Sequence, residues 1–470
     1  MSRASLPRSW YRSEPAATGA AAAAAAIGAR GVTATGAAVA ANAAGVTASG
    51  SQLTELDSGV RVVTEAVPSV RSVALGLWVR TGSRNETPAQ AGVSHFLEHM
   101  LFKGTDTHSA IEISETFDEL GASVNAATGK ETTHLHARFL DEHTEGAFEL
   151  LSEMLLGPTY AEVDSEREVV IEEIAMYEDE PMDRVHDFLA DAVFGEHELG
   201  RRILGTAEVI GSIPVPKIAE YHDARYVGPN LVVSAAGHVD HEAICELSER
   251  LVGAAVGGER SNGSKIDHVP RLRFHEKDTE QYHVCFGGPG LTRDDERRFP
   301  LAVLDSIYGA SSSSRLFVEV REKRGLAYSV GSYSDQYTDA GLVATYVGTR
   351  EENVEQACGL IAKEIERLRS EAVSESELRR GKENIKGRIV LSAESTATRM
   401  SRNARAVLFG TPLYSLDEML AKIDAVTVDD VTALSRELYA PEHLSAACVG
   451  RDEKLFRAAL SQVAEPLAAA

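Results

Sequence analysis

His95-Phe96-Leu97-Glu98-His99 is the stretch of this sequence on which the interpretation of the whole chain depends. Residues four apart lie on one face of a helix, so the two imidazoles can hold a single metal ion. Glu98 shares that face and can act on a water molecule beside the metal. The order H-x-x-E-H inverts the more frequent H-E-x-x-H zinc motif. The run therefore predicts a metal-binding helix with a carboxylate base.

The flanking residues predict that this helix is amphipathic. Apolar residues recur with helical spacing and form a stripe that must face a core: Val93, Phe96, Leu97, Met100 and Leu101. Thr87, followed by Pro88 and Gln90, offers a capping box at the start, and Gly104 offers a stop. The alternative is a solvated polar face that happens to contain two histidines.

A catalytic zinc ion requires a third protein ligand and keeps its fourth position for water. Cysteines are poor candidates for that ligand, because none of the four forms a C-x-x-C pair: Cys245, Cys285, Cys358 and Cys448. The third ligand must therefore be a carboxylate or another histidine.

The segment 163–177 supplies the best carboxylate. Apolar residues with helical spacing predict a buried stripe that ends before Pro181: Val163, Val170, Ile174 and Tyr177. Glu166 and Glu173, seven residues apart, border this stripe, whereas Glu172 points toward solvent. Two stacked carboxylates at a buried border repel each other unless a cation lies near them. Glu173 is therefore predicted as the third ligand and Glu166 as its supporting neighbour. The alternative is an ordinary exposed acidic helix.

A rival source of ligands is the segment 132–139, whose alternating pattern predicts a strand. His134 and His136 share one face of this strand. Paired histidines on a strand can bind metal, but an exposed polar strand face is the more common meaning of the pattern.

Four segments resemble one family, the pitrilysin, insulysin and mitochondrial processing peptidase group of inverted-motif zinc metallopeptidases. They are 95–105 (HFLEHMLFKGT), 121–126 (GASVNA), 166–174 (EREVVIEEI) and 321–328 (REKRGLAY). The first is similar to the processing-peptidase form of the motif almost letter for letter. The resemblance covers nearly the whole chain after about residue 54 and suggests a bacterial member.

The resemblance implies one Zn²⁺ per chain, held by His95, His99 and Glu173, with Glu98 as general base and Glu166 in support. It also implies that Arg321 and Tyr328 reach the active site from the second half, with Tyr328 stabilising the oxyanion. An edge strand at Asn125, Ala126 and Ala127 is implied to bind the substrate backbone. The expected activity is a zinc metalloendopeptidase acting on short or unfolded peptides, including basic, presequence-like ones. The alternative is a non-catalytic partner subunit of a processing-peptidase-like complex.

Composition agrees with a globular enzyme of more than one domain. The chain has 470 residues, 43% hydrophobic and 25% charged. The formal net charge of −24 argues against nucleic acid as a partner and favours cationic ones. No run of 18 or more strongly apolar residues is present, so no membrane span is expected. Scattered cysteines suit a reducing compartment, and a bacterial cytoplasm is expected. A homodimer or a pair with a related subunit is also expected.

The predicted fold class is α+β, with two duplicated halves of mostly antiparallel sheet packed by helices, joined like a clamshell. The halves are 54–252 and 266–470, connected by a Gly- and Ser-rich linker at 253–265. The duplication rests on 218–237, whose pattern of helix, proline turn and strand recurs at 431–450. Residues 1–53, rich in alanine and glycine, are predicted to be a disordered tail. Its basic character also suits a transit peptide, which would place the protein in the mitochondrial matrix.

Overall fold

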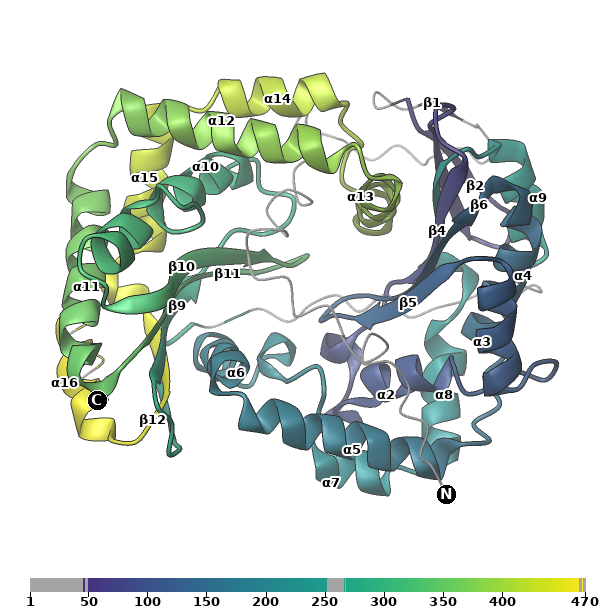
Figure 1. Ribbon diagram of the computed structural model, residues 1–470, viewed down its shortest axis with the longest axis horizontal. Coiled ribbons are helices and arrows are strands. Elements are labelled where there is room, and N and C mark those ends of the chain that lie inside the picture. Colours follow the sequence, from purple (N-terminus) through teal and green to yellow (C-terminus); the bar gives the residue numbers. More distant parts are fainter. Residues whose placement is uncertain (1–44, 47–49, 252–265, 267, 465–466, 468–470) are drawn as a thin grey trace.

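The computed structural model describes residues 45–46, 50–251, 266, 268–464 and 467 of the chain. These residues form two halves, each built on a mixed β-sheet with helices packed against it (Figure 1). The α+β class and the two similar halves predicted from the sequence are confirmed.

The first half contains a seven-stranded sheet in the order β1-β2-β3-β7-β4-β6-β5. β7 lies between β3, to which it is parallel, and β4, to which it is antiparallel. Among the described residues, β5 pairs only with β6 and forms one edge of the sheet. The strands are β1 (Gly45–Val46), β2 (Gln52–Glu55), β3 (Arg61–Ala66), β4 (Ser72–Val79), β5 (Ser123–Thr128), β6 (Thr133–Leu140) and β7 (Leu231–Gly237).

The helices of the first half alternate with its strands in sequence and cover mainly the outer face of the sheet. The longest is α5, and its neighbour α2 carries the metal-binding motif. The helices are α2 (Val93–Met100), α3 (Ala110–Glu119), α4 (Thr144–Leu156), α5 (Val163–Asp179), α6 (Pro181–Phe194), α7 (Ala207–Ser212), α8 (Val215–Arg225) and α9 (His241–Glu249). Their apolar faces and the outward side chains of the sheet form one buried core.

The second half repeats this topology. Its sheet has the order β10-β11-β9-β12-β8, and β12 is parallel to β8 and antiparallel to β9. The arrangement matches β5-β6-β4-β7-β3 strand for strand. The strands are β8 (Leu272–Glu276), β9 (Tyr282–Pro289), β10 (Ala327–Gln336), β11 (Gly341–Thr349) and β12 (Ser445–Gly450). The predicted repeat is therefore correct: α8 leads through a proline-containing turn to β7, as α15 (Val428–Leu438) leads to β12.

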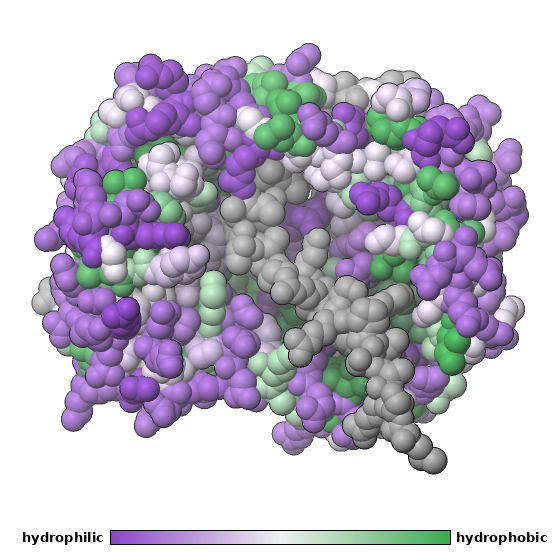
Figure 2. Space-filling view, viewed as in Figure 1, coloured by the Kyte–Doolittle hydropathy of each residue, from purple (hydrophilic) through white to green (hydrophobic). Residues whose placement is uncertain are grey.

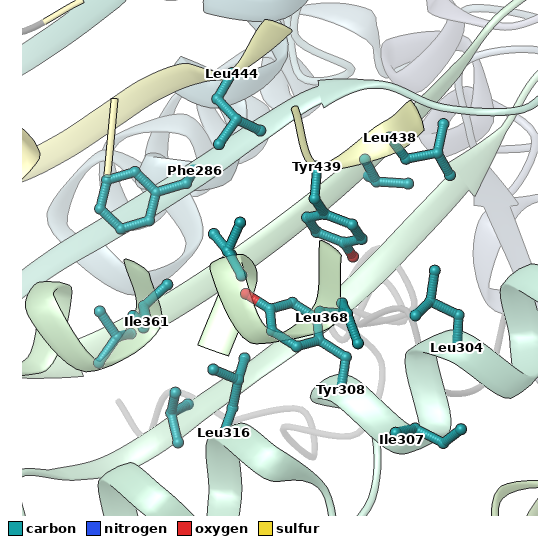
Figure 3. Close-up of a cluster of buried hydrophobic side chains, with 14 of the residues drawn as sticks. Phe286, Leu304, Ile307, Tyr308, Leu316, Ile361, Leu368, Leu438, Tyr439 and Leu444 are labelled. Carbon is teal, nitrogen blue, oxygen red and sulfur yellow. The ribbon is translucent and has the colours of Figure 1, made fainter. Parts of the chain in front are cut away.

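The core of the second half lies between its sheet and the helices packed against that sheet. Figure 3 shows Phe286 of β9 facing helical residues such as Ile361 and Leu368, with Tyr308 and Tyr439 packed edge to face at 5.0 Å. The remaining helices are α10 (Arg298–Tyr308), α11 (Val354–Ser370), α12 (Glu375–Ser392), α13 (Thr396–Phe409), α14 (Leu416–Asp424) and α16 (Glu453–Leu460), with a π-helical segment at Phe317–Glu322.

Each half has one helix that packs against the sheet of the other half. α13 crosses from the second half to the inner face of the first sheet, where Met400 and Ala404 pack against Trp78 and Val232. In return, α6 packs on the inner face of the second sheet, where Val185 and Leu189 meet Cys285, Leu342 and Ala447. Figure 1 shows both helices beside the sheet of the opposite half. Wide separation of the halves would expose these apolar contacts, so the halves are held together by more than a linker.

A buried ionic network also joins the halves. Arg84 of the first half binds Glu131 at 2.7 Å and Asp339 of the second half at 2.9 Å. Glu131 also binds Arg293 of the second half at 2.7 Å and accepts the Thr338 amide at 3.0 Å. Charged groups that are buried need such partners, because an unpaired buried charge is costly.

Two described strands begin before the predicted boundary at residue 54. β1 and the first half of β2 lie within the segment predicted as a tail, and β2 pairs with β3 along Gln52–Glu55. The rest of that segment, 1–44 and 47–49, and the whole predicted linker at 253–265 lie outside the described residues. Within the part that the structure describes, no helix is long and apolar enough to cross a membrane.

Candidate metal centre and active site

The motif helix α2 begins later and ends earlier than the sequence pattern predicts. Thr87, Pro88 and Gln90 do form a capping box, but it opens a separate 3₁₀ turn. Gly92, at φ +94°, interrupts the chain between this turn and α2, and a Cβ there would lie 2.6 Å from the Leu204 carbonyl. The break leaves α2 to start at Val93. It ends at Met100, four residues before Gly104, and the chain continues in turns.

The N-terminus of α2 is capped by a carboxylate that sequence reasoning missed. Glu86 accepts hydrogen bonds from the amides of Gly92 (2.8 Å) and Ser94 (2.7 Å). The side chain is buried, and burial raises its pKa to about 7, against the effect of these hydrogen bonds. Glu86 therefore fixes the start of the helix that carries both histidines.

The structure brings His95, His99 and Glu173 together. Glu173 Oε2 lies 3.3 Å from His99 Nε2 and 3.7 Å from His95 Nε2. One ligand atom from each residue lies within 4.8 Å of the others. Metal bonds of about 2.0–2.1 Å in tetrahedral geometry place ligand atoms roughly 3.3 Å apart. Glu173 Oε2 is also buried without a hydrogen-bond partner. The donor set therefore fits zinc.

Helix α5 presents Glu173 as its periodicity predicts. Val163, Val170 and Ile174 are buried against the core, so the helix has a fixed orientation beside α2. Glu173 lies at the border of this stripe, whereas Glu172 is exposed. The assignment of Glu173 over Glu172 thus has a packing basis.

Glu166 positions His99 from the same helix. Its Oε1 lies 2.8 Å from His99 Nδ1, and its Oε2 lies 2.6 Å from Lys103 Nζ. A carboxylate on the distal ring nitrogen leaves Nε2 free to bind metal and makes the imidazole a stronger ligand. Lys103, not considered from the sequence although it belongs to the quoted motif, neutralises this buried carboxylate.

Glu98 lies on the metal-binding face of α2 and is 8% exposed. Thr128, at the end of β5, lies beside its carboxylate and favours the charged form, while Glu98 Oε2 is buried without a hydrogen-bond partner. Burial raises the pKa of Glu98 to about 7, the range in which a carboxylate serves as both acceptor and donor of a proton. Thr128, whose role no sequence signal indicated, links this base to the edge strand.

The two ligand histidines differ in protonation. Burial and the neighbouring His99 lower the pKa of His95 to about 4, so His95 is neutral, as a metal ligand must be. Burial also acts to lower the pKa of His99, but the hydrogen bond to Glu166 and the nearby carboxylate of Glu173 outweigh it and raise that pKa to about 9. A metal ion at this site must therefore displace a proton from His99.

The predicted substrate residues Asn125, Ala126 and Ala127 lie in β5, the edge strand. Ala126 is buried toward the core, while Asn125 and Ala127 face the inner side of the sheet and are half-buried. Thr128 of the same strand donates a hydrogen bond to the Ser94 carbonyl of α2 at 3.4 Å. The edge strand and the metal helix are thus adjacent.

Arg321 and Tyr328 contact each other but do not contact the metal ligands. Arg321 Nη1 donates to the Tyr328 carbonyl at 2.9 Å, and the guanidinium lies 4.4 Å from the Tyr328 ring centroid. Tyr328 is 78% exposed, at the start of β10. Among the described residues, no hydrogen bond, ion pair or ring contact joins this pair to His95, Glu98, His99 or Glu173.

His134 and His136 do not join the metal cluster, which contains His95, His99 and Glu173 alone among described groups of metal-ligand type. They lie in β6, on the inner face of the sheet, as the alternation predicts. His134 stacks on Trp78 with ring centroids 3.8 Å apart and an interplanar angle of 2°. Their surroundings are therefore aromatic rather than metal-binding.

Comparison with known proteins agrees with this geometry. Residues 61–207 match the family model described as insulinase (peptidase family M16), and residues 212–385 match the M16 inactive domain. The chain belongs to peptidase family M16. An uncharacterized zinc protease of Bacillus subtilis is 41% identical over 83% of this chain and 96% of its own length. One from Streptomyces coelicolor is 41% identical over 82% and 86%.

Solved structures of other proteins share the M16 fold. An M16 inactive-domain structure from Pseudomonas fluorescens has a TM-score of 0.80, covering 86% of this chain and 98% of its own, at 20% identity. A protease from Helicobacter pylori has a TM-score of 0.78, covering 85% and 99%, also at 20% identity. Family membership, the relatives and the His-His-Glu cluster together make this M16 protein a zinc metalloprotease.

Proposed function

We infer that this zinc protease is an endopeptidase that cuts extended peptide segments with Glu98 as the proton-transferring base. The observation that carries this inference is the position of the Glu98 carboxylate. Its buried, unpartnered Oε2 lies on the helix face that presents His95 and His99 to Glu173. A carboxylate next to a zinc site can accept a proton from water and return it to a leaving amine.

The residues divide the chemistry among them. When bound, zinc supplies Lewis-acid activation of water and of the scissile carbonyl. His95, His99 and Glu173 would hold it, and Glu166 keeps His99 in the tautomer that presents Nε2. Glu98 accepts the proton of the attacking water and later donates it to the departing nitrogen. Thr128 lies beside the Glu98 carboxylate and favours its charged form.

The substrate backbone is proposed to pair with the free edge of β5. In the part of the chain that the structure describes, β5 pairs with β6 alone, and Asn125 to Ala127 lead directly to Thr128, which lies beside Glu98. Strand addition recognises extended peptides through their backbone groups. β5 points toward the space between the two halves in Figure 1, and Figure 2 shows a hollow near the centre of this face. Short or unfolded chains are the substrates that suit such a site.

Tyr328 and Arg321 are proposed to complete the site when substrate is present. The Tyr328 hydroxyl would donate to the developing oxyanion and Arg321 would contact the peptide. The high exposure of Tyr328 supports this, because its ring is not committed to a core. The acidic chain, with net charge −24, favours basic peptides by long-range attraction.

The non-catalytic alternative is disfavoured by the complete set of His95, Glu98, His99 and Glu173. We also propose a homodimer or a pair with a related subunit, and a bacterial cytoplasmic location. The cytoplasmic location is supported by the four cysteines, which are all free.

The test compares wild type with Glu98→Gln on a mixed library of unstructured peptides, with a folded protein as control substrate. Wild type should cut internal bonds of the peptides, lose this activity to a chelator and leave the folded protein intact. Glu98→Gln should retain zinc and its melting temperature but lose at least about 100-fold in kcat, because only the proton carrier is removed. Substantial residual cleavage by this variant would refute the role of Glu98.

A further inference from the structure

Three rings, those of Trp78, His134 and His136, form a wall on the inner face of the first sheet beside the edge strand. Trp78 in β4 is the direct cross-strand partner of His134 in β6, and His134 is the partner of Ala127 in β5. His134 lies flat against Trp78, and the His136 ring follows 5.2 Å away with an interplanar angle of 23°. The two imidazoles therefore stand side by side along β6.

On β5, the residues opposite the two histidines of this wall are smaller than the histidines. Ala127 lies in register with His134, and Asn125 with His136. Both are half-buried, as are the two histidines. His134 Nδ1 is buried and has no hydrogen-bond partner. On β5, the residue opposite His134 is therefore an alanine, whose side chain is a single methyl group.

We propose that His134 and His136 form the wall of a side-chain subsite that selects an aromatic residue of the peptide substrate. The proposal rests on the proposed function, since it requires a peptide paired with the free edge of β5. A peptide strand there lies about 4.8 Å from β5 and roughly 10 Å from β6. A large ring opposite Ala127 can extend over the methyl group and reach stacking distance, about 4.5–7 Å, from His134.

The local charges favour a neutral ring over a cation. Arg405 belongs to α13 of the second half, and its guanidinium lies 5.7 Å from the Trp78 ring centroid. Arg138 is exposed two residues beyond His136 on the same strand face. Burial, with the neighbouring His136 and Arg405, lowers the pKa of His134 well below its usual value. His134 is therefore neutral at neutral pH, and an arginine or lysine side chain would meet two cations nearby.

The subsite lies close to the bond that is cut. Ala127 directly precedes Thr128, which lies beside Glu98 and donates to the Ser94 carbonyl of α2. Since a strand advances about 3.3 Å per residue, the selected residue lies within about two positions of the scissile bond. It would determine where in a peptide the enzyme cuts, in addition to the backbone pairing that determines whether a peptide binds.

The experiment uses one unstructured peptide with a single cleavage site, varied one position at a time within three residues on either side. Alanine, phenylalanine, tryptophan, leucine, glutamate and arginine are compared at each position by kcat/KM. One position should favour phenylalanine or tryptophan over alanine by about fivefold to tenfold, the effect expected of one aromatic pair. His134→Ala should bring this ratio close to one, and His134→Phe, which keeps a ring against Trp78, should preserve it.

The ratio of two peptides on one enzyme does not depend on zinc content or on the folded fraction. Ala127→Leu, which fills the space in front of the wall, should also lower the ratio and serves if His134→Ala fails to fold. His108→Ala is the control, because His108 contacts Glu153 on α4, away from the inner face, and should leave the ratio unchanged. An unaltered ratio in His134→Ala or Ala127→Leu, or a preference for arginine or glutamate at that position, would overturn the subsite. A wild-type enzyme that cuts none of the peptides would instead refute the proposed peptidase function.

Discussion

His99 Nδ1 and Glu166 Oε1 lie 2.8 Å apart, so one turn of α5 orients a metal ligand that another helix supplies. The second oxygen of Glu166 binds Lys103, three residues after the end of α2. The metal-binding helix and the helix that supplies Glu173 are therefore connected through side chains that never contact the metal.

Glu166→Gln should weaken zinc binding by about tenfold, because an amide cannot supply the charge that makes His99 a strong ligand. Zinc affinity measured by competition with a chelator checks this. Glu168→Gln, an exposed position on the same helix, is the matched control and should bind zinc as wild type does. Equal affinities for the two variants would show that Glu166 is dispensable to the metal.

Glu173→Gln should lose most of its bound zinc and its activity, whereas Glu172→Gln should keep both. The two residues are adjacent in sequence, but only Glu173 faces the histidines, and Glu172 is exposed. Metal analysis of the purified variants and their melting temperatures test the prediction. If Glu172 is the sensitive position, α5 does not turn Glu173 toward the metal.

Zinc affinity should fall as pH decreases below about 9. The pKa of His99 in the metal-free protein is raised from 6.5 to about 9, and zinc must displace that proton. The apparent affinity should therefore fall by up to about tenfold per pH unit below 9, with proton release on binding. The proton on His99 also stabilises the metal-free fold fully below pH 6.5, and this stabilisation is lost as pH rises through 9. Calorimetry in buffers of different ionisation enthalpy measures the proton release; its absence at pH 7.5 would contradict the assignment.

Glu131→Gln should destabilise the protein by about 3 kcal/mol, because Arg84 and Arg293 lose their shared buried partner between the halves. Urea unfolding measures this effect. Glu220→Gln, which removes an exposed partner of Lys217, should change the free energy of unfolding by less than about 1 kcal/mol. Similar small effects in both variants would mean that the network contributes little to holding the halves together.

Local sequence determined the chemistry of this protein. Helical spacing alone places His95, Glu98 and His99 on one face, and the apolar stripe of the second segment selects Glu173 over Glu172. The repeat of helix, proline turn and strand likewise indicated two similar halves. These inferences are possible from sequence because they depend on residues within about two helical turns of each other or on a pattern that occurs twice.

Tertiary structure decided what surrounds that chemistry. Glu86 replaces Thr87 as the cap of α2 because Gly92 breaks the chain between them. Trp78 meets His134 through strand register, and Met400 meets Trp78 because α13 crosses to the other half. Arg84 pairs with Asp339, which lies 255 residues away in the sequence. No local periodicity encodes such pairs; they follow from how two similar sheets exchange one helix each, and this packing is fixed only when the whole core is formed.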